Sequence, residues 1–387
     1  MRRIDRNNRK LKDVEKKKTL WIVTELFPPD ETSTAYILGE IANTLTQKYC
    51  VKVICGPEIY DKHKAIDANN KFNLDASIEI MRVAGVNFDK NEKVGKALSF
   101  LLMTQRLYAL AKANIQTKDK VLMVTNPAPL ILLMSGLKQK RGFDLNILVH
   151  DVFPENTKPA GIKLPVYGWV KKFFDKAYSR ANHLIVLGRD MADVLSQKVK
   201  RYSPQPKISI IENWADVENI EPQPMPKGSR IVLEYAGNIG RVQGLDKVIN
   251  QLPNDIELHI YGSGAVEEDL KELKHPRVYF HGPYFRSQQN EVLSACHIAI
   301  VTLQEGMYGL GVPSKTYNIL ASGRPVLYFG PHNSEIDLLV REEHIGYCGW
   351  PQKWDMEELI EMGKRARYIA EKRYSKEIIL NKFKNVL

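Results

Sequence analysis

Short runs of apolar, β-branched residues alternate with helix-forming segments along this chain of 387 residues, and the alternation starts twice. The first series opens with a predicted strand at 19–25, a loop and an amphipathic helix at 35–47. The second series opens with a predicted strand at 231–237. Further strands are predicted at 51–56, 121–125, 146–151, 183–188, 208–213, 256–262, 278–282, 299–303 and 325–330. Because strand–loop–helix–strand units build parallel sheets, this order predicts an α/β protein with two open parallel sheets.

The length of the chain also favours two domains, because one core rarely organises so many residues. A polar, proline-rich segment at 216–229 is the predicted linker. It divides a first domain at 19–215 from a second domain at 230–365, and the C-terminal helix, about 366–387, is expected to return to the first domain. The active site is expected in the cleft between the two domains.

Residues 1–18 form a basic arm with nine Lys or Arg against three Asp or Glu. Such a segment is expected to be disordered, and the alternative is electrostatic attachment to an anionic membrane surface. A second segment, 161–178, mixes aromatic residues with lysines. Its aromatic side chains are expected to pack in the core, and the alternative is an interfacial patch that approaches a lipid-linked molecule.

The composition excludes several classes of protein. The chain is 44% hydrophobic and 26% charged, which is typical of globular proteins, and its two most apolar stretches, 97–111 and 121–137, are interrupted by polar residues or prolines. The four cysteines form no Cys-x-x-Cys pair, so no metal site is expected and the thiols are expected to be reduced. We therefore expect a cytoplasmic protein, with peripheral attachment to the inner face of the cell membrane as a further option, and no nucleic-acid partner.

The segment 305–327, EGMYGLGVPSKTYNILASGRPVL, predicts an anion site. A glycine-rich loop leads to Ser314 as a helix N-cap, and Gly323 suits the left-handed position that ends the helix. Lys315 stands in the first turn, where a positive charge is unfavourable unless an anion lies beside it. An anion such as phosphate is therefore expected at this point of the chain.

Two more glycine-containing loops follow predicted strands of the same sheet, at 235–244 and 261–264. The carboxyl ends of parallel strands lie at one edge of a sheet, so the three loops are expected to converge there. Together with Arg241 and Lys315 they predict a pocket for a diphosphate, held by backbone N–H groups and cations. The pattern is neither a GxGxxG fingerprint nor a P-loop.

The order of these motifs resembles a known family. The segments AGNIG, QGLDKVI, HIYGSG, VYFHG and GVPSKTYNILASGRPVL are similar to the C-terminal domain of retaining glycosyltransferases of the GT-B fold, family 4, in the bacterial branch that builds capsule, O-antigen and exopolysaccharide. The segments FPPDETSTAYILGEIANTL and LVHDVFPEN resemble parts of the N-terminal domain of this family. The resemblance covers about residues 19–387 and implies two Rossmann-like domains that face each other across a cleft.

The resemblance also implies the site residues. The expected catalytic residues are His150, Asp151, Arg241 and Lys315. Acceptor-side contacts are expected from Thr32 and Ser33. The expected donor-binding residues are Gly237, Asn238, Gly240, Gly262, Gly264, Pro283, Tyr284, Glu305, Gly311, Ser314, Tyr317 and Asn318.

Six positions depart from the usual form of the family, and two of them are Thr32 and Ser33, which replace the paired glycines of the first loop. Asn318 stands where a glutamate holds the ribose of the nucleotide, and its amide can still hydrogen-bond hydroxyl groups. Leu310 stands where a second glutamate lies near the transferred sugar, so that role is vacant or passes to Glu305. Asn238 and Gln243 stand where an Arg and a Lys bind the phosphates, and Arg241 and Lys315 are expected to substitute for them.

The implied reaction moves a sugar from a nucleotide-sugar, expected to be UDP-linked, to a hydroxyl group of a saccharide acceptor, with retained anomeric configuration. The acceptor is expected to be lipid-linked, in surface polysaccharide assembly. No Asp-x-Asp occurs in the chain, so neither a metal nor another cofactor is expected, and Arg241 and Lys315 would stabilise the leaving diphosphate. His150 and Asp151 would position or deprotonate the acceptor hydroxyl.

Two alternatives remain open. One is a nucleotide-sugar epimerase of the same fold, which needs no second acceptor site. The other is a catalytically silent subunit that binds a nucleotide-sugar, which the departures at Asn318 and Leu310 allow.

Overall fold

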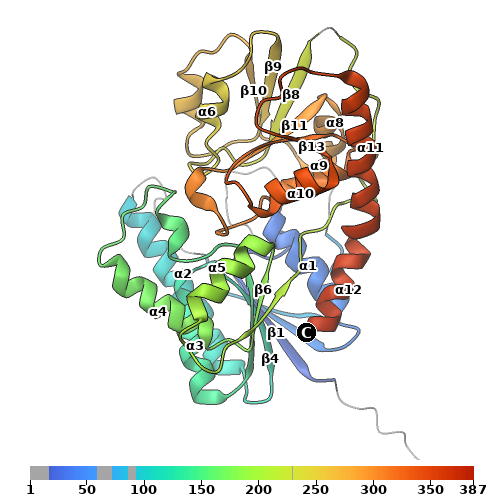
Figure 1. Ribbon diagram of the computed structural model, residues 1–387. Helices are drawn as coiled ribbons and strands as arrows, with labels where there is room; N and C mark the ends of the chain where they lie inside the picture. Colours follow the sequence, from blue (N-terminus) through green and yellow to red (C-terminus); the bar gives the residue numbers. More distant parts are fainter. Residues whose placement is uncertain (1–16, 59–71, 86–92, 229) are drawn as a thin grey trace, which may run out of the picture.

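The computed structural model describes residues 17–58, 72–85, 93–228 and 230–387. Their backbone forms two sheets in which every strand pairs in parallel with its neighbours (Figure 1). The first sheet has the order β3-β2-β1-β4-β5-β6-β7 and the second has the order β10-β9-β8-β11-β12-β13. The predicted fold class, an α/β protein of two Rossmann-like domains, is confirmed. The basic arm lies almost wholly outside the described residues.

The strands and helices of the first domain are as follows. The strands are β1 (Thr19–Val23), β2 (Cys50–Cys55), β3 (Glu79–Arg82), β4 (Lys120–Val124), β5 (Asp144–Val149), β6 (His183–Val186) and β7 (Lys207–Ile210). The helices are α1 (Ser33–Leu45), α2 (Lys93–Asn114), α3 (Pro129–Arg141), α4 (Tyr167–Ser179) and α5 (Arg189–Val199), with a short 3-10 helix, η1 (Glu155–Thr157).

The second domain and the C-terminal segment contain the remaining elements. The strands are β8 (Ile231–Ala236), β9 (Ile256–Tyr261), β10 (Val278–Gly282), β11 (Ile298–Thr302), β12 (Val326–Phe329) and β13 (Gly346–Cys348). The helices are α6 (Leu245–Asn250), α7 (Glu267–Lys271), α8 (Gln289–Ser294), α9 (Lys315–Ala321), α10 (Glu335–Glu343), α11 (Met356–Arg373) and α12 (Lys376–Val386), with the 3-10 helices η2 (Arg286–Gln288) and η3 (Glu305–Met307).

The central strands are largely apolar because helices cover both faces of each sheet. All residues of β6 and β11 are buried, for example, and each of these strands has a hydrogen-bonded neighbour on both sides. The continuous apolar runs in the sequence therefore indicate strands that are buried inside a parallel sheet. Among the described residues, no helix combines the length and the apolar character that crossing a membrane requires.

The C-terminal segment differs from the predicted helix at about 366–387, because that helix would run through a break between two helices. It contains two helices that meet at Tyr374 and Ser375, where the backbone amide of Ala215 donates a hydrogen bond of 2.7 Å to the carbonyl oxygen of Tyr374. Helix α11 packs against α9 of the second domain, and α12 packs against α1 of the first (Figure 1). The C-terminal segment therefore contacts both domains.

The loop after β11 also connects the two domains, at a place separate from the C-terminal helices. The amide of Val152 donates a hydrogen bond to the carbonyl oxygen of Leu310 (3.0 Å), and the amide of Gly309 donates one to the Asp190 carboxylate (3.2 Å). Nearby, Arg189 Nε pairs with Glu335 Oε2 at 3.0 Å. These contacts bring the carboxyl-end loops of both sheets face to face.

Candidate active site

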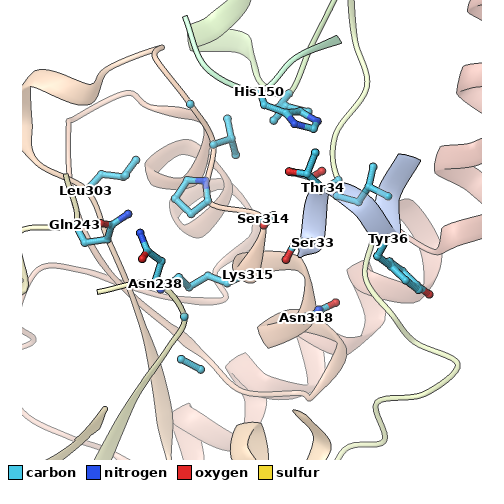
Figure 2. A pocket seen from close by; sticks show the side chains of 18 of the residues that line it. Ser33, Thr34, Tyr36, His150, Asn238, Gln243, Leu303, Ser314, Lys315 and Asn318 are labelled. Carbon is cyan, nitrogen blue, oxygen red and sulfur yellow. The ribbon is translucent and has the colours of Figure 1, made fainter. Parts of the chain in front are cut away.

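A pocket of about 400 Å³ lies between the two domains, at the carboxyl ends of both sets of strands. The first domain contributes the start of α1, the end of β5 and the segment 213–216; the second contributes the loops after β8, β10 and β11 and the start of α9. Figure 2 shows His150 on one wall of this pocket and Ser314 and Lys315 on another. The structure thus brings together segments that are far apart in the sequence, as the predicted interdomain site requires.

Lys315 lies in the wall of the pocket that the start of α9 forms. Its Nζ atom is buried, has no hydrogen-bond partner and lies 3.3 Å from the centroid of the Tyr235 ring. Burial holds the pKa of this ammonium well below its usual value, and the nearby Glu234 acts in the opposite direction. A buried ammonium without a partner is costly, and a bound anion would supply the missing hydrogen bonds.

Glu234 lies behind this lysine on β8. The residue is 1% exposed, its Oε1 atom has no partner, and Cys296 Sγ donates to Oε2 at 3.5 Å. Burial raises the pKa of this carboxyl to about 8, so most of it is protonated at pH 7. Glu234 therefore gives Lys315 little compensating charge. Glu234 is not among the predicted site residues, although a glutamate inside the apolar strand IVLEYA was a visible signal.

Ser314 lies directly before α9 but does not cap the helix as predicted. Its backbone angles are φ −62° and ψ −27°, which are helical, whereas a capping residue needs an extended backbone to turn its hydroxyl toward the helix amides. The predicted C-terminus is confirmed, because Gly323 has φ +66°. The hydroxyl of Ser314 is therefore free of a capping role and lines the pocket beside Lys315.

Two amide side chains complete this wall. Asn238 and Gln243 line the pocket, and Gln243 Oε1 is buried without a hydrogen-bond partner. These are the positions where the resembled family has an Arg and a Lys. Neutral amides there leave Lys315 as the only basic side chain of this wall among the described residues that line the pocket.

His150 and Asp151 follow β5 on the opposite wall. Thr125 Oγ1 accepts hydrogen bonds of 3.2 Å from both backbone amides and so fixes this turn. The Nε2 atom of His150 is buried without a partner, and burial lowers the pKa of the imidazole to about 4, so the ring is neutral. Asp151 is partly open to the pocket, but the surrounding protein raises the pKa of its carboxyl to about 6. Asp151 is therefore ionised at neutral pH and available to accept a hydrogen bond or a proton.

Ten of the predicted site residues line the pocket: Ser33, His150, Asp151, Gly237, Asn238, Tyr284, Gly311, Ser314, Lys315 and Asn318. Eight do not: Thr32, Gly240, Arg241, Gly262, Gly264, Pro283, Glu305 and Tyr317. Thr32 instead caps α1, since its Oγ1 accepts a hydrogen bond from the amide of Ala35.

Three polar residues among these eight have side chains outside the pocket. Arg241 and Glu305 are exposed, so the structure brings neither to the pocket. Tyr317 is 1% exposed and packs edge-to-face against Tyr374, with 5.1 Å between the ring centroids. The predicted substitution of Arg241 for a phosphate-binding cation therefore has no geometric support.

Gly262 and Gly264 contact the loop after β8, which lines the pocket. A Cβ atom at Gly262 would come 1.9 Å from the carbonyl oxygen of Gly237, and one at Gly264 would come 2.3 Å from that of Ile239. Only glycine allows the loop after β9 to approach the loop after β8 this closely. The two glycines therefore position the pocket-lining loop without lining the pocket themselves.

Arg286 is a second cation in the pocket, and it is not among the predicted site residues. Its guanidinium carbon lies 3.5 Å from the centroid of the Tyr36 ring, so a residue of η2 stacks on a residue of α1 across the two domains. Its buried Nη1 atom has no hydrogen-bond partner and lies 3.9 Å from Asp216 Oδ2. Arg286 follows a loop without the glycine pattern of the other three, so no local motif marked it as a site residue.

No group of three or more His, Cys, Asp or Glu within the described part of the chain is placed to hold a metal ion.

Three comparisons with known proteins agree with this architecture. The family model described as group 1 glycosyl transferases matches residues 233–348. Over 326 residues the chain is 31% identical to the probable glycosyltransferase WbjE of Pseudomonas aeruginosa, which covers 76% of this chain and 80% of that protein. Two solved structures have the same fold. Sucrose-phosphate synthase of Thermosynechococcus elongatus has a TM-score of 0.69 at 12% identity, covering 96% of this chain and 98% of its own. The Anabaena protein HepE in complex with UDP has a TM-score of 0.64 at 14% identity, and the match covers 95% of this chain and 99% of HepE.

Proposed function

The chain belongs to the group 1 glycosyltransferases, and on this basis we propose that it is a retaining, family 4 enzyme that transfers a sugar from a UDP-sugar to a hydroxyl group of a saccharide acceptor. The observation that carries the proposal is the buried ammonium of Lys315, which has no hydrogen-bond partner in a pocket between the two domains. A diphosphate supplies the anionic oxygens that such a group needs. The likeness to HepE, which was solved with UDP, supports uridine as the nucleoside.

In the proposed reaction, the diphosphate leaves as the bond to the sugar breaks, and negative charge develops on its oxygen atoms. Lys315 lies where this charge would develop, with the hydroxyl of Ser314 and the amide of Gln243 beside it. Groups that are fixed before the reaction stabilise such charge without reorganisation. The wall formed by α9 and the loop after β8 is thus the proposed leaving-group site.

The acceptor hydroxyl would attack on the face of the sugar from which the diphosphate leaves, since a single attack on the opposite face would invert the anomeric configuration. The carboxylate of Asp151 would accept the hydrogen bond, and then the proton, of this hydroxyl group. The neutral ring of His150 would orient the transferred sugar through its unpartnered Nε2 atom.

We expect this transfer to proceed without a divalent cation. Lys315 and Arg286 provide positive charge inside the pocket. In metal-dependent enzymes that act on nucleotide-sugars, a metal ion provides the positive charge that stabilises the leaving diphosphate. With an excess of EDTA, the initial rate of UDP release should stay within about twofold of the untreated rate. Loss of activity that Mg²⁺ restores would contradict a metal-free site.

The proposed acceptor is lipid-linked, in surface polysaccharide synthesis, and an exposed apolar face supports this part of the proposal. Phe174 and Tyr178 of α4 are buried, but Trp169 and Phe173 are 69% and 59% exposed. Val166, just before the helix, is 70% exposed, and Lys172 and Lys176 are exposed along the same helix. Apolar side chains flanked by lysines are typical of a surface that lies on an anionic membrane.

The double variant Trp169→Ser/Phe173→Ser should therefore lose binding to vesicles that contain anionic phospholipid. Each aromatic side chain removed from the membrane interface is expected to lower the partition coefficient about tenfold or more. Co-sedimentation with vesicles measures this effect. Tyr368→Ser, at a tyrosine of α11 that is 62% exposed, is the matched control and should bind like the parent. Unchanged binding of the double variant would contradict the membrane face.

The direct test of the function is to incubate the purified protein with UDP-sugars, with and without a polyprenyl-diphosphate-linked monosaccharide. The proposal predicts UDP release that depends on the acceptor, and a product whose new linkage has the anomeric configuration of the donor by proton NMR. An epimerised donor formed without acceptor would instead identify an epimerase. Binding of UDP-sugar with no turnover of any kind would identify a silent subunit.

A further inference from the structure

Asp216 is a buried carboxylate of the pocket to which the proposed chemistry assigns no task. The residue is 5% exposed, lies between the two sheets in the sequence and lines the pocket. Its Oδ1 atom accepts a hydrogen bond of 2.8 Å from Asn219 Nδ2, and its Oδ2 atom lies 3.9 Å from Arg286 Nη1. The second contact is too long for a hydrogen bond, so Oδ2 retains capacity to accept one.

Asn318 fixes the position of Asp216 through a hydrogen bond to its backbone. The amide of Asp216 donates a hydrogen bond of 3.1 Å to Asn318 Oδ1. Asn318 stands three residues after Lys315 on α9, so the two side chains lie on the same side of the helix, about one turn of 5.4 Å apart. The backbone of Asp216 is thus held beside α9, at the helix position one turn after that of Lys315, whose ammonium marks the proposed diphosphate site.

In a nucleoside diphosphate, the ribose is the next group after the α-phosphate. Its 2′- and 3′-hydroxyl groups are donors that need an acceptor, and the carbonyl oxygen of Asn318 is already engaged by the backbone of Asp216. A carboxylate can accept two hydrogen bonds from neighbouring hydroxyl groups at once. The unused capacity of the pocket at this position therefore matches a vicinal diol.

We propose that Asp216 is the ribose-binding residue of this protein, and that it accepts hydrogen bonds from the 2′- and 3′-hydroxyl groups of the nucleotide. The inference rests on the proposed function, because it takes Lys315 as the diphosphate site. Asn318 is then a positioning residue that acts on Asp216 through its backbone. Arg286 provides a cation on the other side of the carboxylate and stacks on Tyr36, which ties the ribose subsite to the first domain.

The test compares the binding of UDP and 2′-deoxy-UDP by isothermal titration calorimetry. The parent should bind UDP about tenfold or more tightly than 2′-deoxy-UDP, because the deoxy compound lacks a hydrogen bond to a charged group. In Asp216→Ala, UDP should lose affinity while 2′-deoxy-UDP loses less, so that the ratio of the two dissociation constants approaches one. Asp216→Asn, which keeps the shape of the side chain and one acceptor oxygen, should give a ratio between those of the parent and Asp216→Ala.

Glu218→Gln is the matched control, since Glu218 is a linker carboxylate whose side chain is 60% exposed and outside the pocket. This variant should keep the ratio of the parent. A ratio that stays at the parental value in Asp216→Asn and Asp216→Ala would overturn the inference, even if both nucleotides bind more weakly, because uniform weakening indicates a structural role. A parent ratio of one would overturn it as well, and in both cases UDP binding would leave the proposed function standing. A parent protein that binds neither UDP nor GDP would overturn the proposed function together with the inference.

Discussion

Replacing Lys315 with methionine should lower kcat/KM for sugar transfer by about 10²–10³-fold and leave the protein at least as stable as before. The loss of activity is expected because a preorganised donor to the leaving group typically contributes this much to catalysis. The preserved stability is expected because Nζ is buried without a partner, so its removal ends an unfavourable burial of charge. Methionine also keeps most of the side-chain volume and a favourable contact with the Tyr235 ring.

Steady-state kinetics and chemical denaturation measure the two effects on the same preparation. Arg241→Ala is the matched control, because Arg241 is an exposed cation of a neighbouring loop and lies outside the pocket. It should keep kcat/KM within about threefold of the parent. A Lys315→Met variant that retains more than about a tenth of the activity would contradict the proposed leaving-group site. So would a large loss of stability, which would assign Lys315 a structural role.

Replacing Asp151 with asparagine should lower the rate of transfer by about 10²–10⁴-fold and should remove the acid limb of the pH profile. Burial raises the pKa of this carboxyl to about 6, and the ionised form is the one that accepts a proton. As the pH falls through 6, the parent should therefore lose activity, about tenfold for each further pH unit. His150 is neutral throughout this range, because burial lowers the pKa of its ring to about 4.

The profile of kcat/KM between pH 4.5 and 7.5 measures this limb, with circular dichroism at each pH to confirm that the protein is folded. The residual activity of Asp151→Asn should be nearly independent of pH in this range. Asp193→Asn, at an exposed carboxylate of α5, should keep both the rate and the limb. An acid limb that persists in Asp151→Asn would assign the titration to another group.

The sequence predicted the two sheets because buried parallel strands leave continuous apolar runs in the chain. It missed β3 and β13, which are the short edge strands of the two sheets. The first reads EIMR, with no buried residue, and the second is the three-residue GYC. Edge strands like these carry little of the apolar pattern that the prediction used.

The site could be predicted where one local segment carries the signal. Lys315 was found because a lysine in the first turn of a helix is electrostatically misplaced. Arg241 and Arg286 show what local sequence cannot decide. Both follow strands of the same sheet, but the direction of each side chain depends on the partner across the cleft, and only Arg286 meets Tyr36.

Asp216 could not be found from sequence for a related reason. It lies in a segment predicted as a linker, and its contacts with Asn318 and Arg286 join positions 102 and 70 residues away. Contacts between residues so far apart in the sequence leave no local pattern from which they could be predicted. The residues that the sequence missed are therefore those whose role depends on the assembly of both domains.

The central claim is that Lys315 binds the diphosphate of the donor. Titrations of UDP and uridine into the parent and into Lys315→Met test it most directly, because the two ligands differ only in the diphosphate. We predict that UDP binds at least tenfold more weakly to Lys315→Met than to the parent, while the affinity for uridine stays unchanged. Equal affinity of both proteins for UDP would contradict the claim.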